Sequence, residues 1–284
     1  MSFNVRGSFR DGGTPNAWAS RAALNVETIR RCSPDVIGFQ ELQSGNLDTY
    51  EESLPRYDHV PGPPYGNGKH ASFNSIFFDK DRLRLLDSGG FWLSETPGSY
   101  SSSWDSRVVR SANWARFEGT FAGTDLSFLH LNSHLDHVSK AARVEGGGLI
   151  LREISGLLRR FGDETPVVVT GDFNCRPGTP TYRNFLSGGY VDTYLAAGVD
   201  DGNAAHTFHA FKGSRYRDAR PGLGARRIDW ILLRDPNERL RPLSHSIVRD
   251  HAGQTYPSDH YPILAVLAPG QTKRGSPETG LPPN

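Results

Sequence analysis

Short apolar runs, separated by polar and glycine- or proline-rich stretches, recur along this 284-residue chain. Most of these runs are too short for a typical helix and are rich in valine, isoleucine, leucine and phenylalanine, which is typical of buried strands. We therefore predict strands at residues 3–5, 35–39, 75–78, 83–86, 126–131, 167–170, 228–233 and 263–267.

Two segments show helical periodicity instead. We predict that the first helix starts with Thr14 as N-cap and Pro15 as the first helical residue, and that it stops before Pro34. Its apolar face would consist of Trp18, Ala22, Val26 and Ile29. The second helix carries its apolar face at 150–161, and three glycines at 146–148 weaken its start.

The order of these elements predicts a single α/β domain over residues 1–268. Strands outnumber helices, and some neighbouring strands have connections too short for a helix, which favours a sandwich of mixed sheets over a regular βα barrel. Residues 55–72 and 94–112 are predicted loops, and long irregular loops often carry function. The proline- and glycine-rich residues 269–284 predict a flexible tail.

Composition excludes some functions. Lys and Arg total 32 against 31 Asp and Glu, so a net charge of +1 argues against coating nucleic acid through a broad basic face, although a locally basic cleft remains possible. Two cysteines, Cys32 and Cys175, imply no disulfide framework. We expect no transmembrane segment and see no leader pattern. The compartment stays open, and nothing in the sequence points to a partner protein.

Acidic side chains stand at or near the ends of predicted strands at four places. Glu41, Asp172, Asp229 and Asp259 each lie beside an apolar run, where an unpaired charge is costly. For one such residue alone, a turn or a helix cap is an equally good explanation. Four in one chain suggest a shared site around a cation. Mg²⁺ prefers oxygen ligands, with Glu41 as the best candidate and Asp259 next.

Other polar residues complete this hypothesis. Asn174 stands two residues after Asp172, so on a strand both side chains would point the same way and could hold an attacking water. Asp229 would pair with His260 and favour its imidazolium form. Of the histidines at 130, 134 and 137, His134 is predicted to face the site and His130 to sit in the core. A zinc site is a weaker alternative there, because the segment starts as a strand.

In this order, the motifs resemble the endonuclease/exonuclease/phosphatase family of metal-dependent phosphoesterases. The matching segments, at 3–5, 40–41, 132–136, 171–174, 227–230 and 258–260, cover nearly the whole chain. The resemblance implies a four-layer sandwich of two mixed β-sheets flanked by helices. It also implies that Asn4 lies near the metal and that His134 and His260 contact the scissile phosphate. Nuclease members often carry an acid where this chain has Arg6, which could engage phosphate instead.

The expected reaction is hydrolysis of a phosphate ester by in-line attack of water, with Mg²⁺ as cofactor and Mn²⁺ as a possible substitute. A phosphorylated small molecule is the preferred substrate, with a DNA or RNA nuclease as alternative and a catalytically inactive binding module as a third possibility. Besides Arg6, we predict substrate contacts from Trp92, Arg110 and His209.

Overall fold

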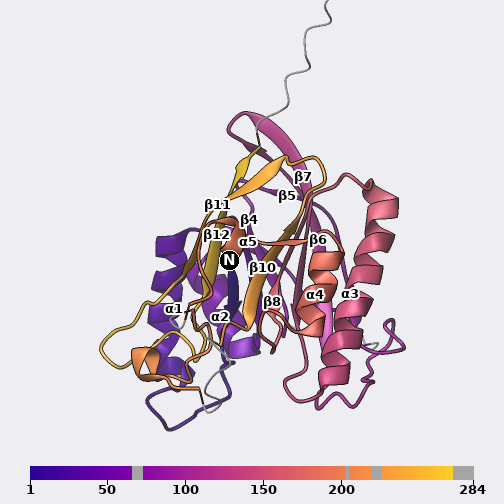
Figure 1. The fold of residues 1–284 in the computed structure, drawn as a ribbon. Coiled ribbons are helices and arrows are strands. Elements are labelled where there is room, and N and C mark those ends of the chain that lie inside the picture. Colours follow the sequence, from indigo (N-terminus) through magenta and orange to yellow (C-terminus); the bar gives the residue numbers. More distant parts are fainter. Residues whose placement is uncertain (66–72, 203–204, 219–225, 271–284) are drawn as a thin grey trace, which may run out of the picture.

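The computed structural model describes residues 1–65, 73–202, 205–218 and 226–270, which form two six-stranded sheets (Figure 1). In order across the first sheet stand β11 (Leu240–Ile247), β12 (Ile263–Pro269), β1 (Ser2–Asn4), β2 (Val36–Gln40), β4 (Ile76–Asp79) and β3 (Tyr57–Val60). The second sheet contains β5 (Arg84–Trp92), β6 (Ser111–Phe121), β7 (Thr124–His134), β8 (Val167–Asp172), β10 (Asp229–Arg234) and β9 (Val191–Asp192). Both sheets are mixed, because β1 pairs with β2 and β7 with β8 in parallel among antiparallel neighbours.

Helices cover the outer face of each sheet and complete four layers (Figure 1). The first sheet carries α1 (Trp18–Cys32) and α2 (Ser44–Ser53), and the second carries α3 (Lys140–Phe161) and α4 (Pro180–Ser187). Buried side chains such as Ile29 and Phe39 join α1 to its sheet, and Ile150 and Leu131 join α3 to the other. Short helical turns occur at α5 (Thr193–Ala196) and η1 (Gly213–Arg215). The predicted four-layer α/β sandwich is confirmed.

The first helix starts later than predicted, at Trp18. The Thr14 hydroxyl accepts from the Asn16 backbone N–H and so holds a turn instead of capping the helix. The Asn16 carbonyl, which a helix beginning at Pro15 would use internally, accepts a hydrogen bond from the Arg21 side chain at 2.8 Å. These local hydrogen bonds are compatible with a helix that starts at Trp18 but not with one that starts at Pro15.

The hydrophobic pattern did not predict β3, β6, β9, β11, α2 and α4, nor the short turns α5 and η1. Helix α2 is mostly polar, and a reciprocal capping box between Gln43 and Asn46 starts it while Tyr50 anchors it in the core. Strand β3 lies inside the predicted loop 55–72, of which residues 66–72 lie outside the described residues. Strand β11 is an edge strand with a bulge after Pro242. Pro269 ends β12, so it is not in a tail, and residues 271–284 lie outside the described part.

A polar layer lies between the sheets beneath the ends of the central strands. Gln40 donates to Asn132 at 2.7 Å, and Asn132 donates to the Phe39 carbonyl at 2.7 Å. A Cβ at Gly38 would lie 2.1 Å from the Thr170 hydroxyl, so only glycine permits this close approach of the two sheets. These bonds fix the spacing of the strand ends on which the candidate site stands.

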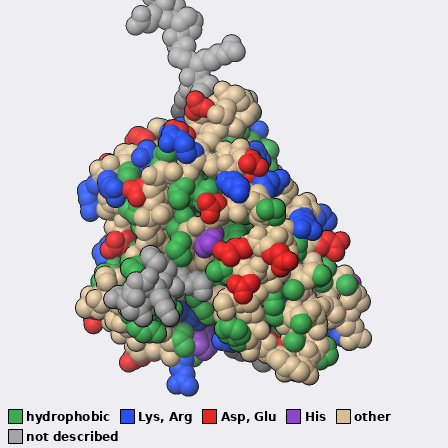
Figure 2. Space-filling model, turned by 180° about the vertical axis from the view of Figure 1, so that it is seen from behind, with side chains coloured by type: hydrophobic (Ala, Val, Ile, Leu, Met, Phe, Trp, Pro, Cys, Tyr) green, Lys and Arg blue, Asp and Glu red, His purple; other side chains and the backbone are tan. Residues whose placement is uncertain are grey.

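Acidic and basic side chains are interspersed over the face seen in Figure 2, where Lys and Arg do not gather into one broad patch. This agrees with the near-zero net charge of the sequence. In the part of the chain that the structure describes, no helix combines the length and the apolar character needed to cross a membrane.

Candidate active site

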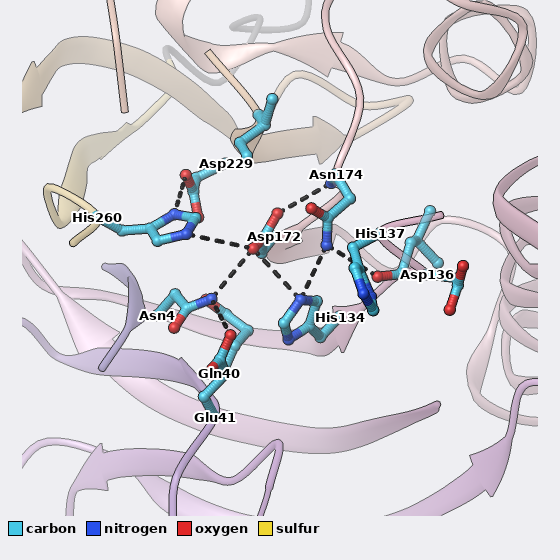
Figure 3. A network of polar contacts seen from close by, with 12 residues as sticks. Asn4, Gln40, Glu41, His134, Asp136, His137, Asp172, Asn174, Asp229 and His260 are labelled. Carbon is cyan, nitrogen blue, oxygen red and sulfur yellow. Dashed lines mark hydrogen bonds and ion pairs between the residues drawn. The ribbon is translucent and has the colours of Figure 1, made fainter. Parts of the chain in front are cut away.

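Strand register brings the predicted site residues together. On the second sheet Asp172 at the end of β8 stands opposite His134 of β7 on one side and Asp229 of β10 on the other. On the first sheet Asn4 at the end of β1 pairs with Gln40, the last residue of β2. Because the two sheets pack face to face, their strand ends form the two sides of one cleft (Figure 3).

Asp172 is the hub of this arrangement and is almost fully buried. Its Oδ2 atom lies 3.1 Å from Asn4 Nδ2, 3.3 Å from His134 Nε2 and 3.7 Å from His260 Nε2, while Oδ1 accepts from the Asn174 backbone N–H at 2.9 Å (Figure 3). Burial and the neighbouring Asp229 carboxylate raise the pKa of Asp172 above its usual range, against the opposing effect of His260. A carboxylate with a raised pKa can exchange a proton near neutral pH.

Asp229 and His260 form the predicted carboxylate–imidazole pair. His260 Nδ1 lies 2.9 Å from Asp229 Oδ2, so its hydrogen is directed to the carboxylate and Nε2 is directed toward Asp172. Burial alone would lower the pKa of His260, but the carboxylates of Asp229 and Asp172 outweigh it and raise the pKa. His260 is therefore an imidazolium, a cation facing the cleft.

His134 is held in the opposite charge state. Asn174 Nδ2 donates to His134 Nε2 at 2.9 Å and to the Leu135 carbonyl at 3.0 Å. Burial and the nearby Arg110 and His260 cations lower the pKa of His134 well below its usual value, so the ring is neutral. Its Nδ1 atom then carries the hydrogen and has no hydrogen-bond partner among the described residues. That N–H is available to an oxygen of a ligand.

The relation between Asp172 and Asn174 differs from the one predicted. Strand β8 ends at Asp172, and Asn174 adopts a left-handed conformation with φ of 51° beyond the strand. Through this turn the Asn174 backbone N–H contacts Asp172, while the Asn174 side chain contacts His134. Strand alternation no longer applies past Asp172. Arg6 and Glu41, which follow β1 and β2, also have positive φ values of 61° and 59°. Strain of this kind in non-glycine residues clusters at functional sites.

Glu41 carries the less satisfied carboxylate. Its Oε1 accepts from Asn4 Nδ2 at 3.2 Å, whereas buried Oε2 has no hydrogen bond among the described residues and only a 3.9 Å approach from Arg10. Asp259 stands across the same cleft and forms a 3.3 Å ion pair with Arg6. Burial raises the pKa of Asp259, with Glu41 among the causes.

These residues fit a hard cation. The unpaired buried oxygen of Glu41, together with the Asp259 carboxylate in the same cavity, is the donor chemistry that Mg²⁺ prefers. Asn4 directs its amide nitrogen to Glu41, and its amide oxygen accepts from the Arg6 backbone N–H at 3.1 Å. Asp172, Asp229 and His260 also place ligand atoms within 4.8 Å of one another. In that second group Asp229 and His260 already form a carboxylate–imidazolium pair, so a cation fits the Glu41 side better.

A buried arginine ties together the two loops on the Glu41 side. Arg21 of α1 is 0% exposed and has only backbone carbonyls as hydrogen-bond acceptors. The acceptors are Val5 (2.6 Å), Gly7 (2.6 Å), Asn16 (2.8 Å), Pro257 (2.9 Å) and Arg6 (3.2 Å). Arg21 therefore fixes the turn after β1 against the segment that carries Asp259. No sequence pattern pointed to this role, because Arg21 lies in an ordinary amphipathic helix.

The cleft opens into a cavity of about 490 Å³. The cavity is lined by Asp172, Asn174, His134, His260, Glu41 and Asp259. Three of the predicted substrate contacts, Arg6, Trp92 and Arg110, also line it. Arg6 is largely engaged by Asp11 at 3.0 Å, whereas the Arg110 Nε atom has no partner among the described residues.

The prediction that His209 contacts substrate is wrong. Its side chain is 0% exposed and does not line the cavity. The ring stacks on Tyr261 at 3.9 Å and accepts a hydrogen bond from the Gly213 backbone at 3.2 Å. Its backbone N–H donates to the Asp259 carbonyl at 2.9 Å, so His209 helps to hold Asp259 in place. Phe208, its neighbour in the chain, lines the cavity instead.

Several cavity-lining residues went unpredicted. They are Arg10, Tyr65, Phe73, Tyr100, His137, Phe208 and Arg226. Most stand in irregular segments without hydrophobic periodicity, so no local pattern relates them to the strand ends. The one available signal was the position of Tyr100 in a long serine-rich loop.

Comparison with known proteins agrees with this geometry. Residues 1–260 match the sequence profile of the Endonuclease/Exonuclease/phosphatase family. A search of curated protein sequences gives no significant match.

Among solved structures, the chain resembles the mannosyl-6-phosphatase Bt3783 of Bacteroides thetaiotaomicron VPI-5482, with 28% identity, a TM-score of 0.80 and coverage of 94% of this chain and 98% of that one. An endonuclease/exonuclease/phosphatase from Bacteroides vulgatus is 30% identical, with a TM-score of 0.80 and coverage of 94% and 97%. TDP2 of D. rerio, complexed with a single-strand DNA product, is 21% identical over 94% and 96% with a TM-score of 0.69, which shows a shared fold alone.

Proposed function

Because the chain belongs to the Endonuclease/Exonuclease/phosphatase family, we propose that it is a magnesium-dependent hydrolase of a phosphorylated small molecule such as a sugar phosphate. The observation that carries the proposal is the set of polar groups around Asp172 (Figure 3). A carboxylate with a raised pKa, an imidazolium and a neutral imidazole converge there at one wall of an open cavity. Such groups can activate a water molecule and stabilise the negative charge that develops during hydrolysis of a phosphate ester.

In this mechanism Asp172 orients a water molecule and takes its proton as the water oxygen bonds to phosphorus. The bond between phosphorus and the leaving oxygen breaks, and that oxygen receives a proton from solvent. His260 and the Nδ1–H of His134 stabilise negative charge on the non-bridging oxygens. Asn174 keeps His134 in the tautomer that can donate. Glu41, with Asp259 and Asn4 nearby, would hold Mg²⁺, which would supply further positive charge at the phosphate.

A phosphate-release screen tests the proposal. Sugar phosphates, nucleotides, phospholipid headgroups and nucleic acids are offered to the wild-type protein with Mg²⁺ or Mn²⁺, and Asp172→Asn serves as the blank. We expect metal-dependent release from at least one small-molecule ester, abolished by chelation. If release from every substrate equals the blank, the chain is not this hydrolase.

The nuclease alternative has less support. Arg6, a cation at the metal side, is occupied by acidic partners, and the protein has no broad excess of positive charge. Cleavage or binding of DNA or RNA with a steep salt dependence would favour this alternative. In a catalytically inactive binding module, the polar groups around Asp172 would have no catalytic role. Failure to bind Mg²⁺ in a calorimetric titration would favour that reading.

A further inference from the structure

Three aromatic side chains form one wall of the cavity. Ring centroids lie 5.4 Å apart for Tyr65 and Trp92, 5.1 Å for Tyr65 and Tyr100, and 4.8 Å for Trp92 and Tyr100. Trp92 is only 3% exposed, whereas Tyr65 and Tyr100 are 41% and 56% exposed. All three line the same cavity as Asp172 and His260. The two tyrosines thus offer apolar surface to whatever enters the site.

A hydrogen-bond network holds this wall in place. The Ser101 hydroxyl lies 2.6 Å from that of Ser94 and 2.8 Å from that of Thr96, and so fixes the turn that carries Tyr100. The Trp92 backbone N–H donates to the Pro97 carbonyl at 2.9 Å, and its indole N–H donates to the Pro64 carbonyl at 3.3 Å. The serine-rich composition of the loop therefore has a structural reason. A surface organised in advance loses little entropy when a ligand binds.

The rings form a corner. Tyr100 stands at 70° to Tyr65 and at 84° to Trp92, while Tyr65 and Trp92 are tilted by 34°. A flat nucleobase is best held between parallel rings or on one broad face. A puckered ring presents C–H groups on one face and hydroxyls at its edge, and it can contact both sides of a corner. The Tyr65 hydroxyl remains a neutral donor and acceptor, because burial and the neighbouring Tyr100 raise its pKa.

Charge in the surrounding residues selects the orientation of the ligand. Arg110, 7% exposed and lining the same cavity, has a 3.3 Å contact with His137 Nδ1, and its Nε atom is unpaired among the described residues. An anion is therefore favoured at the inner end. The loop segment 93–106 contains Glu95 and Asp105 but no Lys or Arg. The other cations that line the cavity, Arg6, Arg10 and Arg226, come from other segments. A group packed against the aromatic wall therefore meets no cation from this loop, which favours an uncharged group there.

We propose that Tyr65, Trp92 and Tyr100 form a subsite for the leaving group of the substrate, and that this group is the neutral ring of a monosaccharide whose phosphate faces Arg110 and the Asp172 hub. The inference rests on the proposed function and deepens it, because it names the substrate as a hexose phosphate. Each phosphate released leaves the free sugar at the aromatic corner.

Steady-state kinetics with three classes of substrate tests the subsite: a panel of aldohexose 1- and 6-phosphates, a set of mononucleotides, and acetyl phosphate, whose leaving group contains no ring. For Tyr100→Ala we expect KM for the best hexose phosphate to rise about tenfold with little change in kcat, because a stacking contact of about 1.4 kcal/mol is lost. KM for acetyl phosphate should not change. Tyr100→Phe, which keeps the ring, should recover most of the affinity.

Binding gives a readout that does not depend on turnover. The fluorescence of Trp92 should respond to hexose phosphate added to metal-free Asp172→Asn protein, and Tyr100→Ala in that background should raise Kd by a similar factor. Leu243→Ala is the matched control, because Leu243 is an exposed side chain (48%) of β11 that does not line the cavity. It should change neither Kd nor KM.

The outcomes separate the two proposals. If the wild-type protein hydrolyses nucleotides but no hexose phosphate, the proposed chemistry stands and the sugar subsite is wrong. An unchanged KM of Tyr100→Ala for hexose phosphate, or a rise confined to nucleotides, overturns the subsite as well. If no ester is hydrolysed above the Asp172→Asn blank, the proposed function fails and the subsite fails with it.

Discussion

The two sides of the cleft are bonded to different degrees. On the side of the second sheet, both oxygens of Asp172 and the functional nitrogens of His260 have partners within the protein. On the side of the first sheet, Glu41 keeps one buried oxygen without a hydrogen bond among the described residues. A buried carboxylate oxygen without a partner is costly. We call the Asp172 side the finished side and the Glu41 side the unfinished side. Under the proposed function, the finished side handles the proton and a cation would complete the unfinished side.

The largest expected effect on turnover comes from replacing Asp172 on the finished side. Asp172→Asn should lower kcat by about a thousandfold or more, because the amide cannot take a proton from water. Mg²⁺ affinity should stay close to that of the wild-type protein if the metal binds on the other side. Turnover numbers and calorimetric Mg²⁺ titrations of the same preparations give both quantities. A loss of metal affinity as large as the loss of turnover would mean that the two sides are not separate.

The reciprocal change is Glu41→Gln. Replacing one carboxylate oxygen by an amide nitrogen removes charge from the metal side, so the Mg²⁺ concentration for half-maximal activity should rise about 100-fold. The stabilisation of the folded protein by Mg²⁺ should disappear as well. Thermal unfolding with and without Mg²⁺ measures it without turnover. An unchanged metal requirement would move the cation away from Glu41.

Arg21 offers an indirect way to disturb the metal side. Arg21→Met removes the donors to five backbone carbonyls, so we expect a loss of about 3 kcal/mol in the free energy of unfolding. Because Asp259 should then be less well placed, the Mg²⁺ requirement should rise about tenfold. Denaturant titrations and Mg²⁺ titrations of activity test both effects.

Two further variants control for general loss of stability. Arg21→Lys keeps a cation and part of the hydrogen bonding, so both quantities should recover in part. Arg31→Met removes an exposed helix arginine that pairs with Asp250 and should cost less than about 1 kcal/mol. If Arg21→Met lowers stability but leaves the Mg²⁺ requirement unchanged, Arg21 has no influence on the metal side.

The residues of the finished side of the site could be predicted from the sequence more completely than the rest of the site. Asp172 ends one continuous apolar run and Asp229 begins another. Antiparallel pairing of β8 with β10 brings the two residues to the same edge of the sheet, independently of the loops. Asn174 was predicted for the wrong reason, since its place depends on a left-handed turn that strand alternation does not describe. The local sequence identified the residue type but not its geometry.

The misses share one cause, which is dependence on contacts distant in sequence. Arg21 donates to Pro257, 236 residues away, and no local pattern records such a bond. The polar side chain of His209 suggested a position at the rim of the cavity. In the structure its ring packs in the interior against Tyr256 and Tyr261. The edge strand β11 and the polar helix α2 lack an apolar face strong enough to reveal them. Tertiary packing decides all of these positions.

A buried neutral histidine also contacts the elements that form each side of the cleft. His130 lies 3.0 Å from Thr170 on the strand of Asp172, and His209 supports Asp259. Burial lowers the pKa of each to about 3, whereas an unfolded histidine titrates near its ordinary value of 6.5. Below that value the unfolded state binds more protons, so each histidine should reduce stability by about 1.4 kcal/mol per pH unit as the pH falls from 6 toward 3.

Urea unfolding of His130→Gln and His209→Gln between pH 7 and pH 4.5 measures this smallest of the four effects. Each variant should lose stability less steeply on acidification than the wild-type protein does, whatever its stability at pH 7. The exposed His251 gives the control, and His251→Gln should keep the wild-type slope. Equal slopes for all four proteins would mean that the two buried histidines already carry protons in the folded state. In that case neither side of the cleft would rest on a neutral ring.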